Sequence, residues 1–259
     1  LANYIAKYVA GFSARALTAP GIGGGAGNPD AAILALFAAG EQGVWYDPSD
    51  FSTMFQDSAG TTPVTAVGQP VGKILDKSGR GNHASQSTAA ARPVLQQDGN
   101  GKYYLAFDGV DDKLLSTSID FSGTNEATLA VAFSRTNDTA AGYIFSHSAA
   151  VNTQPGVSMS SPAFAAPSIG LVSVGTSLTL ALQNPAQAAG IPVVALGQTK
   201  ISTDKNILQV NAVQVASAGS DQGSGNYANV VANVGSVPSG GAYFNGKLYG
   251  VVYLSRNET

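Results

Sequence analysis

From residue 44 onward, apolar and polar side chains alternate with a period of two residues, which is typical of strands that bury one face. Residues 208–215 show this most clearly, because Leu, Val and Ala side chains are interleaved with Gln and Asn. Clusters of Gly, Asn and Asp separate the apolar runs and indicate turns. The pattern predicts strands at 44–46, 71–76, 93–97, 103–107, 113–118, 128–134, 143–146, 169–174, 178–183, 193–199, 207–215, 230–234, 242–244 and 248–254.

The first 42 residues follow a different pattern. Apolar side chains recur at helical spacing in residues 1–12, which predicts a short amphipathic helix, and the glycine-rich residues 13–27 predict a linker. A second short helix is predicted at 31–39, after an Asn-Pro start signal. This helix is apolar nearly all round, so it either associates with another chain or covers one end of the β-domain. We therefore divide the chain into an attachment segment, 1–42, and a β-domain, 43–259.

The strand pattern also predicts the fold class. No helical crossover pattern follows residue 45, which excludes a parallel α/β sheet. In the stretch 75–115, glycine-rich and acidic turns join successive strands, as expected for hairpins in antiparallel sheets. We predict an all-β fold, specifically a two-sheet antiparallel jelly-roll sandwich with short N-terminal helices.

Composition narrows the functional classes. Only 11% of the 259 residues are charged, the net charge is −3, and no basic cluster is present, so no binding to nucleic acid is expected. No apolar run reaches 18 residues, so no membrane insertion is expected. The absence of cysteine excludes disulfides, thiolate metal sites and cysteine nucleophiles.

Three stretches of the β-domain resemble a known family. Residues 76–84 and 105–112 resemble the laminin-G-like branch of the concanavalin A-like lectin/glucanase superfamily, and residues 244–253 resemble the last strand of that branch. The resemblance covers about residues 44–256. It implies a concanavalin A-like jelly roll and leaves the ligand open.

The beginning of the β-domain carries a second resemblance. Residues 43–50 and 56–64 resemble an opening found in phage and prophage virion proteins that carry this domain. The resemblance implies a bacteriophage virion protein at the particle surface, such as a head or tail fiber, which contacts other virion proteins through its N-terminal segment and forms a homo-oligomer. Its domain would adhere to host-surface or environmental glycans. The alternative is a purely structural capsid or tail decoration protein that binds no sugar.

A glycan hydrolase is the third and least favoured hypothesis. A glucanase needs two carboxylates that flank the scissile bond, and in this superfamily they lie on one strand. The chain has three glutamates, Glu41, Glu126 and Glu258, and no two of them share a predicted strand. We therefore expect no enzymatic activity and assign no catalytic residue.

Two places are candidates for sugar contact. Trp45, the single tryptophan, could stack on a sugar ring, although a lone tryptophan in an early strand also fits the core. Tyr227, together with Asn226 and Asn229, could form a shallow polar and aromatic binding face.

Asp108, Asp111 and Asp112 form the densest acidic cluster of the sequence. Three carboxylates within five residues could bind calcium, which prefers oxygen ligands. The sequence Asp-Gly-Val-Asp-Asp is equally a turn, in which Asp side chains accept hydrogen bonds from nearby backbone amides. No other cofactor is expected.

Overall fold

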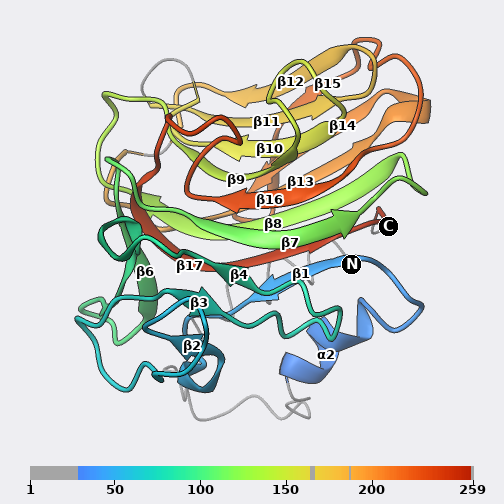
Figure 1. Cartoon of the computed structure of the whole chain (residues 1–259). Coiled ribbons are helices and arrows are strands. Elements are labelled where there is room, and N and C mark those ends of the chain that lie inside the picture. The colour runs from blue at the N-terminus through green and yellow to red at the C-terminus, as the bar shows by residue number, and fades with distance from the viewer. Residues whose placement is uncertain (1–28, 164–166, 187, 258–259) are drawn as a thin grey trace, which may run out of the picture.

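The computed structural model describes residues 29–163, 167–186 and 188–257, which form two antiparallel β-sheets packed face to face (Figure 1). Sheet A has the order β15-β14-β13-β8-β17-β6-β5, and β1 pairs with the remaining part of β17. Its strands are β1 (Gly43–Tyr46), β5 (Val94–Gln97), β6 (Tyr103–Asp108), β8 (Glu126–Arg135), β13 (Val193–Lys200), β14 (Lys205–Val210), β15 (Val213–Ala218) and β17 (Asn245–Leu254).

Sheet B has the order β12-β11-β10-β9-β16-β7-β4-β3-β2. Most neighbours in this order are consecutive along the chain, but β16 lies between β9 and β7, which precede it by many strands, as expected of a jelly roll. Its strands are β2 (Met54–Phe55), β3 (Lys73–Ile74), β4 (Ala84–Ser85), β7 (Leu114–Asp120), β9 (Tyr143–Ser148), β10 (Gly156–Ser160), β11 (Ile169–Val174), β12 (Leu178–Gln183) and β16 (Asn229–Val234). Three short 3₁₀ helices, η2 (Phe51–Thr53), η3 (Ala89–Ala91) and η4 (Ile201–Thr203), lie in the connections.

Strand β8 shows how the apolar pattern builds the core. Leu129, Val131 and Phe133 point between the sheets and join the main hydrophobic cluster. Ala130 and Ala132 point to the other face of sheet A and are also buried. A strand buried on both faces becomes an almost continuous apolar run, which is what the sequence of β8 shows.

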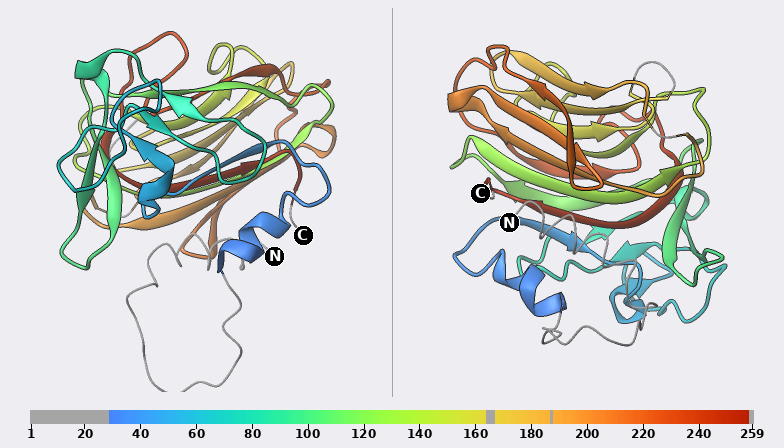
Figure 2. Two further views of the ribbon diagram at one scale, coloured as in Figure 1. Left: turned by 60° about the horizontal axis from the view of Figure 1, so that its bottom comes forward. Right: turned by 180° about the vertical axis from the view of Figure 1, so that it is seen from behind.

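Helix α2 (Pro29–Ala35) covers that outer face of sheet A (Figure 2). Ile33 of this helix and Phe37, just after its end, pack against Trp45 and residues of β8, β13 and β17. The Arg80 guanidinium donates a hydrogen bond to the Phe37 carbonyl, and Lys77 pairs with Asp30 at 3.2 Å. The second predicted helix is confirmed, although it ends at Ala35 rather than at residue 39, and it covers the β-domain. The predicted helix 1–12 and the glycine linker lie outside the described residues.

Two strand predictions are wrong, and one strand was not predicted. Residues 207–215 form two strands, because Asn211 and Ala212 take positive φ values of 50° and 66° and make a tight turn between β14 and β15. Residues 242–244 form only an isolated bridge at Tyr243. Residues 149–167, where no strand was predicted, contain the fully buried β10. Among the described helices, none is long and apolar enough to cross a membrane.

A cleft of aromatic rings and carboxylates

Trp45 lies inside the protein. Its side chain is 1% exposed and packs between α2 and sheet A, with Lys77 Nζ 4.3 Å from the ring centroid. Both ring faces are therefore covered, and a sugar cannot stack on Trp45 in this structure. Of the two interpretations of the lone tryptophan, the structure supports the core residue.

Tyr227 is also buried, with 2% of its side chain exposed. Its hydroxyl lies 2.8 Å from Thr199 Oγ1 and 2.9 Å from Ser173 Oγ, so it links the two sheets inside the sandwich. Burial raises the pKa of Tyr227 to about 12. Asn226 and Asn229 remain at the surface, and Asn226 Nδ2 donates to the Ser122 carbonyl at 2.7 Å. The predicted aromatic binding face therefore does not form, because its ring points into the core.

The acidic cluster has the geometry of a turn and is also compact enough for a cation. Asp108 Oδ1 accepts from the amides of Val110 and Asp111, and Asp112 Oδ2 accepts from the Asp108 amide at 3.0 Å. One carboxylate oxygen of each aspartate lies within 4.8 Å of the others, which suits a hard cation. Burial, together with the charges of Asp108 and Asp111, raises the pKa of Asp112 to about 6. Calcium binding stays a prediction.

A cleft of about 480 Å³ combines half-exposed aromatic rings with carboxylates and hydroxyls. The rings of Phe51 and Tyr103 meet edge to face, with centroids 4.8 Å apart and planes at 74°. Asp30, Asp50, Ser49 and Ser52 complete the lining. The cleft therefore brings partly buried aromatic rings and two carboxylates together.

The loop after β1 places Phe51 and Asp50 in this cleft. Asp50 caps η2, because its Oδ1 accepts from the Ser52 amide at 3.2 Å and from Ser52 Oγ at 2.6 Å. Asp47 makes the same arrangement with Ser49 at 3.0 and 2.6 Å. These two Asp-x-Ser turns fix the loop, so Phe51 projects beside Tyr103 at the start of β6.

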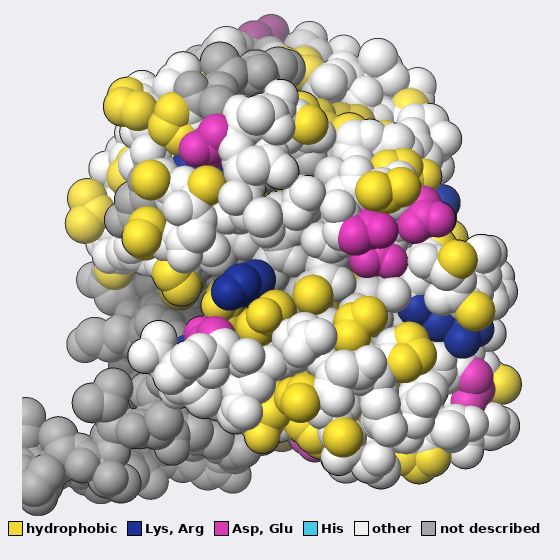
Figure 3. Space-filling model, turned by 90° about the vertical axis from the view of Figure 1, so that its left-hand side faces the viewer, with side chains coloured by type: hydrophobic (Ala, Val, Ile, Leu, Met, Phe, Trp, Pro, Cys, Tyr) yellow, Lys and Arg dark blue, Asp and Glu magenta, His cyan; other side chains and the backbone are white. Residues whose placement is uncertain are grey.

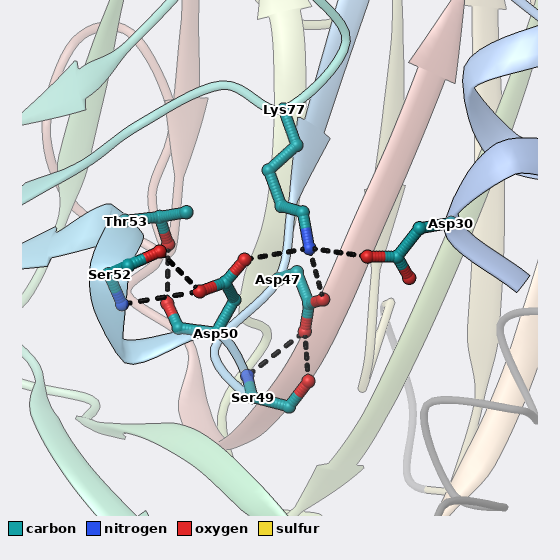
Figure 4. A network of polar contacts seen from close by, with 7 residues as sticks. All are labelled: Asp30, Asp47, Ser49, Asp50, Ser52, Thr53 and Lys77. Atoms are coloured by element: carbon teal, nitrogen blue, oxygen red, sulfur yellow. Dashed lines mark hydrogen bonds and ion pairs between the residues drawn. The ribbon is translucent and has the colours of Figure 1, made fainter. Parts of the chain in front are cut away.

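Lys77 holds the carboxylates of the cleft in position (Figure 4). Its Nζ lies 3.2 Å from Asp30, 3.0 Å from Asp47 and 3.0 Å from Asp50. Burial opposes the charge of Lys77, but Asp47 and Asp50 outweigh it and raise the pKa of Lys77. Burial also acts on Asp50, where hydrogen bonds from Ser52 and Lys77 prevail and lower the pKa. The carboxylate of Asp50 is therefore ionised at neutral pH.

The glycine-rich turn 76–84 positions Lys77. Asp76 accepts hydrogen bonds from the amides of Trp45, Ser78 and Asn82 at 2.9 to 3.0 Å. Asn82 Nδ2 in turn donates to the Gly43 carbonyl at 2.8 Å. The turn is thereby fastened to β1, and Lys77 projects toward α2 and η2.

Sequence reasoning did not identify Phe51, Tyr103, Asp30 or Asp50 as site residues. The only local signal was the repeated Asp-x-Ser pattern at 47–52, which also occurs in ordinary turns. The cleft joins residues from α2, η2 and β6, and their proximity depends on the tertiary fold.

No protein-family model and no curated protein matches the sequence. Among solved structures, an arabinofuranosidase in complex with arabinofuranosyl-α-1,2-xylobiose superposes with a TM-score of 0.60 at 14% identity, covering 88% of this chain and 62% of that one. The botulinum neurotoxin serotype D binding domain gives 0.54 at 8% identity, covering 72% of this chain and 46% of that one. In both cases this chain spans less than two thirds of the other protein's length.

Domain 4 of AbnA, an extracellular arabinanase from Geobacillus stearothermophilus, was solved in complex with arabinotriose. It superposes with a TM-score of 0.51 at 13% identity, covering 68% of this chain and 79% of that one. The fold is a two-sheet jelly-roll sandwich. At these identities the likeness shows the fold alone, and it agrees with the concanavalin A-like architecture that the sequence predicts.

Proposed function

We propose that this chain is a non-enzymatic, lectin-like module that binds glycans in the cleft between Phe51, Tyr103 and Asp50. The observation that carries the proposal is the partly buried ring pair beside the ionised carboxylate of Asp50. Aromatic rings pack against the apolar faces of sugars, while carboxylates and serine hydroxyls accept hydrogen bonds from sugar hydroxyls. Both kinds of contact meet within one cleft.

The solved structures support a carbohydrate ligand. Jelly-roll domains of similar architecture were solved with arabinotriose and with N-acetylneuraminic acid, the latter in the botulinum neurotoxin serotype D ligand-binding domain at a TM-score of 0.53. In this chain, Asp30 and Asp50 would repel a sugar carboxylate across the cleft. We therefore propose a neutral glycan as the ligand.

The cleft does not favour hydrolysis. A glycosidase needs one carboxylic acid that stays protonated near neutral pH and a second carboxylate across the bond. In this cleft, the pKa of Asp50 is lowered, and Lys77 contacts both Asp30 and Asp50. These carboxylates are suited to accept hydrogen bonds, so we propose binding without catalysis.

We further propose that the domain is displayed on a phage particle. The support is the resemblance of residues 43–50 and 56–64 to the opening of phage and prophage virion proteins. In this proposal, the N-terminal segment contacts other virion proteins, and the cleft stays open to host-surface or environmental glycans. The alternative is a purely structural decoration protein. It would bind no glycan in the cleft, which distinguishes it from the adhesion module.

A glycan array probed with the whole chain tests the proposal. The whole chain is required because Asp30, on α2, lines the cleft. Binding to neutral glycans, with weaker binding to sialylated or uronic-acid glycans, is the expected result. Absence of binding at high avidity would exclude the adhesion function and leave the decoration protein.

A further inference from the structure

Charged side chains are unevenly distributed along the strands. Residues 136–199 contain a single charged side chain, Asp138, and residues 206–246 contain only Asp221. These ranges supply β9 to β12 and β15, as well as most of β13 and β14. On the face shown in Figure 3, the charged side chains form a few small groups within a largely uncharged surface. One end of the sandwich is therefore almost free of charge.

Both sheets end there in an unprotected edge strand. Strands β12 and β15 are each six residues long and contain neither charged residues nor proline. In the described residues, the backbone of β15 pairs only with β14, and that of β12 only with β11. Leu178 and Val213 are 41% and 63% exposed on these strands. Soluble proteins usually block such edges with lysine, proline or covering segments.

The other edges of this molecule are covered. Residues 68–71 pair with β5, since Leu95 donates to the Gln69 carbonyl at 2.9 Å and accepts from Gly68 at 2.7 Å. Residues 62–64 cover β2 in the same way, through Gln56 and Val64. The turn 76–77 covers β1. The open edges are thus confined to one end of the described fold.

We propose that the β12 and β15 end is an interface for a second copy of this chain, which continues both sheets across a dimer. The two edges lie next to each other, because β12 packs against β15 (Figure 1). A two-fold axis perpendicular to the sheets would pair β15 with β15 and β12 with β12, antiparallel in both layers. An extended peptide could pair with only one of these edges. A stable interface buries about 1,200–2,000 Å². A dimer that uses both edges and their neighbouring side chains comes closer to this area than a peptide on a single edge.

The proposed dimer leaves the glycan cleft free. Tyr103 begins β6, which lies at the opposite side of sheet A from β15. Two clefts would therefore face outward from the two ends of the dimer, and weak sites gain affinity when they bind together. The interface itself does not depend on whether the cleft binds sugar.

Sedimentation velocity of the whole chain over a range of concentrations tests the proposal. Val213→Lys places a charge on the open edge of each copy, which the dimer would have to bury, and we expect dimerisation about tenfold weaker or more. Val67→Lys is the matched control, because Val67 is 46% exposed in the segment beside the covered β5 edge. If Val213→Lys fails to fold, Ser217→Lys on the same strand replaces it.

Hydrogen exchange at low and high protein concentration identifies the surface directly. The proposal expects amides in 178–183 and 213–218 to exchange more slowly in the dimer, with no change in Val213→Lys. It is overturned if the wild type stays monomeric at all concentrations, if Val213→Lys dimerises like Val67→Lys, or if protection appears only at other residues.

Discussion

His147 and Tyr253 join the two sheets through a hydrogen bond in the middle of the core. The Tyr253 hydroxyl lies 3.0 Å from His147 Nδ1, and both side chains are fully buried. The other ring nitrogen, Nε2, lies 3.0 Å from the Ile119 carbonyl, which can only accept. Nε2 therefore carries the proton, and Nδ1 accepts from Tyr253. The histidine is neutral, as the surrounding apolar core requires.

This arrangement makes the fold sensitive to acid. Burial lowers the pKa of His147 to about 4, against about 6.5 in the unfolded chain. The stabilisation is therefore present above pH 6.5 and is lost as pH falls toward 4, a loss of about 3 kcal/mol. Urea unfolding above pH 6.5 and near pH 4 measures how much free energy of unfolding each protein loses on acidification. His147→Gln should lose about 3 kcal/mol less than the wild type, because it has no histidine to protonate. Equal losses in the two proteins would contradict the assignment.

In the ion cluster around Lys77, removing the partner of a buried charge should cost more stability than removing an exposed charge. Asp47 is 5% exposed and Asp30 is 33% exposed, although both contact Lys77. Lys77→Met leaves the buried Asp47 charge unpaired and should lower the free energy of unfolding by about 3 kcal/mol. Asp30→Asn should cost less than about 1 kcal/mol. Urea denaturation compares the two variants, and similar costs would show that the cluster does not depend on burial.

The sequence predicted the sandwich because the signals of its strands are local. The run in β8 and the turn residues of 75–115 encode their structures within a few residues. The two-residue strands β2 and β4 carry too little periodicity to stand out, and β10 lies in a stretch rich in Ser and Pro. The candidate site was missed because Asp30, Phe51 and Tyr103 meet only in the tertiary structure. Trp45 and Tyr227 were candidates by residue type, and the fold buries both.

The pKa of Asp112 predicts a stabilising substitution. It is raised by burial and by the neighbouring carboxylates to about 6, above the value of about 3.9 in the unfolded chain. The ionised form therefore costs stability at neutral pH, and this cost disappears as pH falls below the unfolded value. Asp112→Asn should stabilise the protein by about 1 kcal/mol at pH 7, after allowance for solvent screening, and have little effect near pH 4. Thermal unfolding at both pH values measures the difference.

Calcium should offset the destabilising charge of the Asp108, Asp111 and Asp112 cluster. A bound cation would stabilise the ionised carboxylates, so calcium should raise the unfolding temperature of the wild type at pH 7. Asp112→Asn removes one ligand charge and should respond much less. Magnesium serves as the control, since it demands a stricter geometry. An unfolding temperature that calcium leaves unchanged would identify the cluster as a turn alone.

The ring of Tyr103 should account for a measurable part of glycan affinity. Stacking contacts of an aromatic ring contribute about 0.5–1.5 kcal/mol, so Tyr103→Ala should weaken binding about two- to tenfold. Tyr243→Ala is the matched control, because Tyr243 is also half-exposed but lies outside the cleft. Isothermal titration with a neutral glycan identified on the array compares the three proteins.

The pH dependence of the same titration separates the roles of ring and carboxylate. Because the pKa of Asp50 lies below its usual value, binding by the wild type should persist through the ordinary titration range of an aspartate and fall only at lower pH, when Asp50 takes up a proton. Asp50→Asn should weaken binding at neutral pH and abolish the fall in affinity at low pH. Tyr103→Ala should weaken binding but retain this fall. If Tyr243→Ala weakens binding as much as Tyr103→Ala, the sugar lies on another surface, and the cleft loses its proposed role.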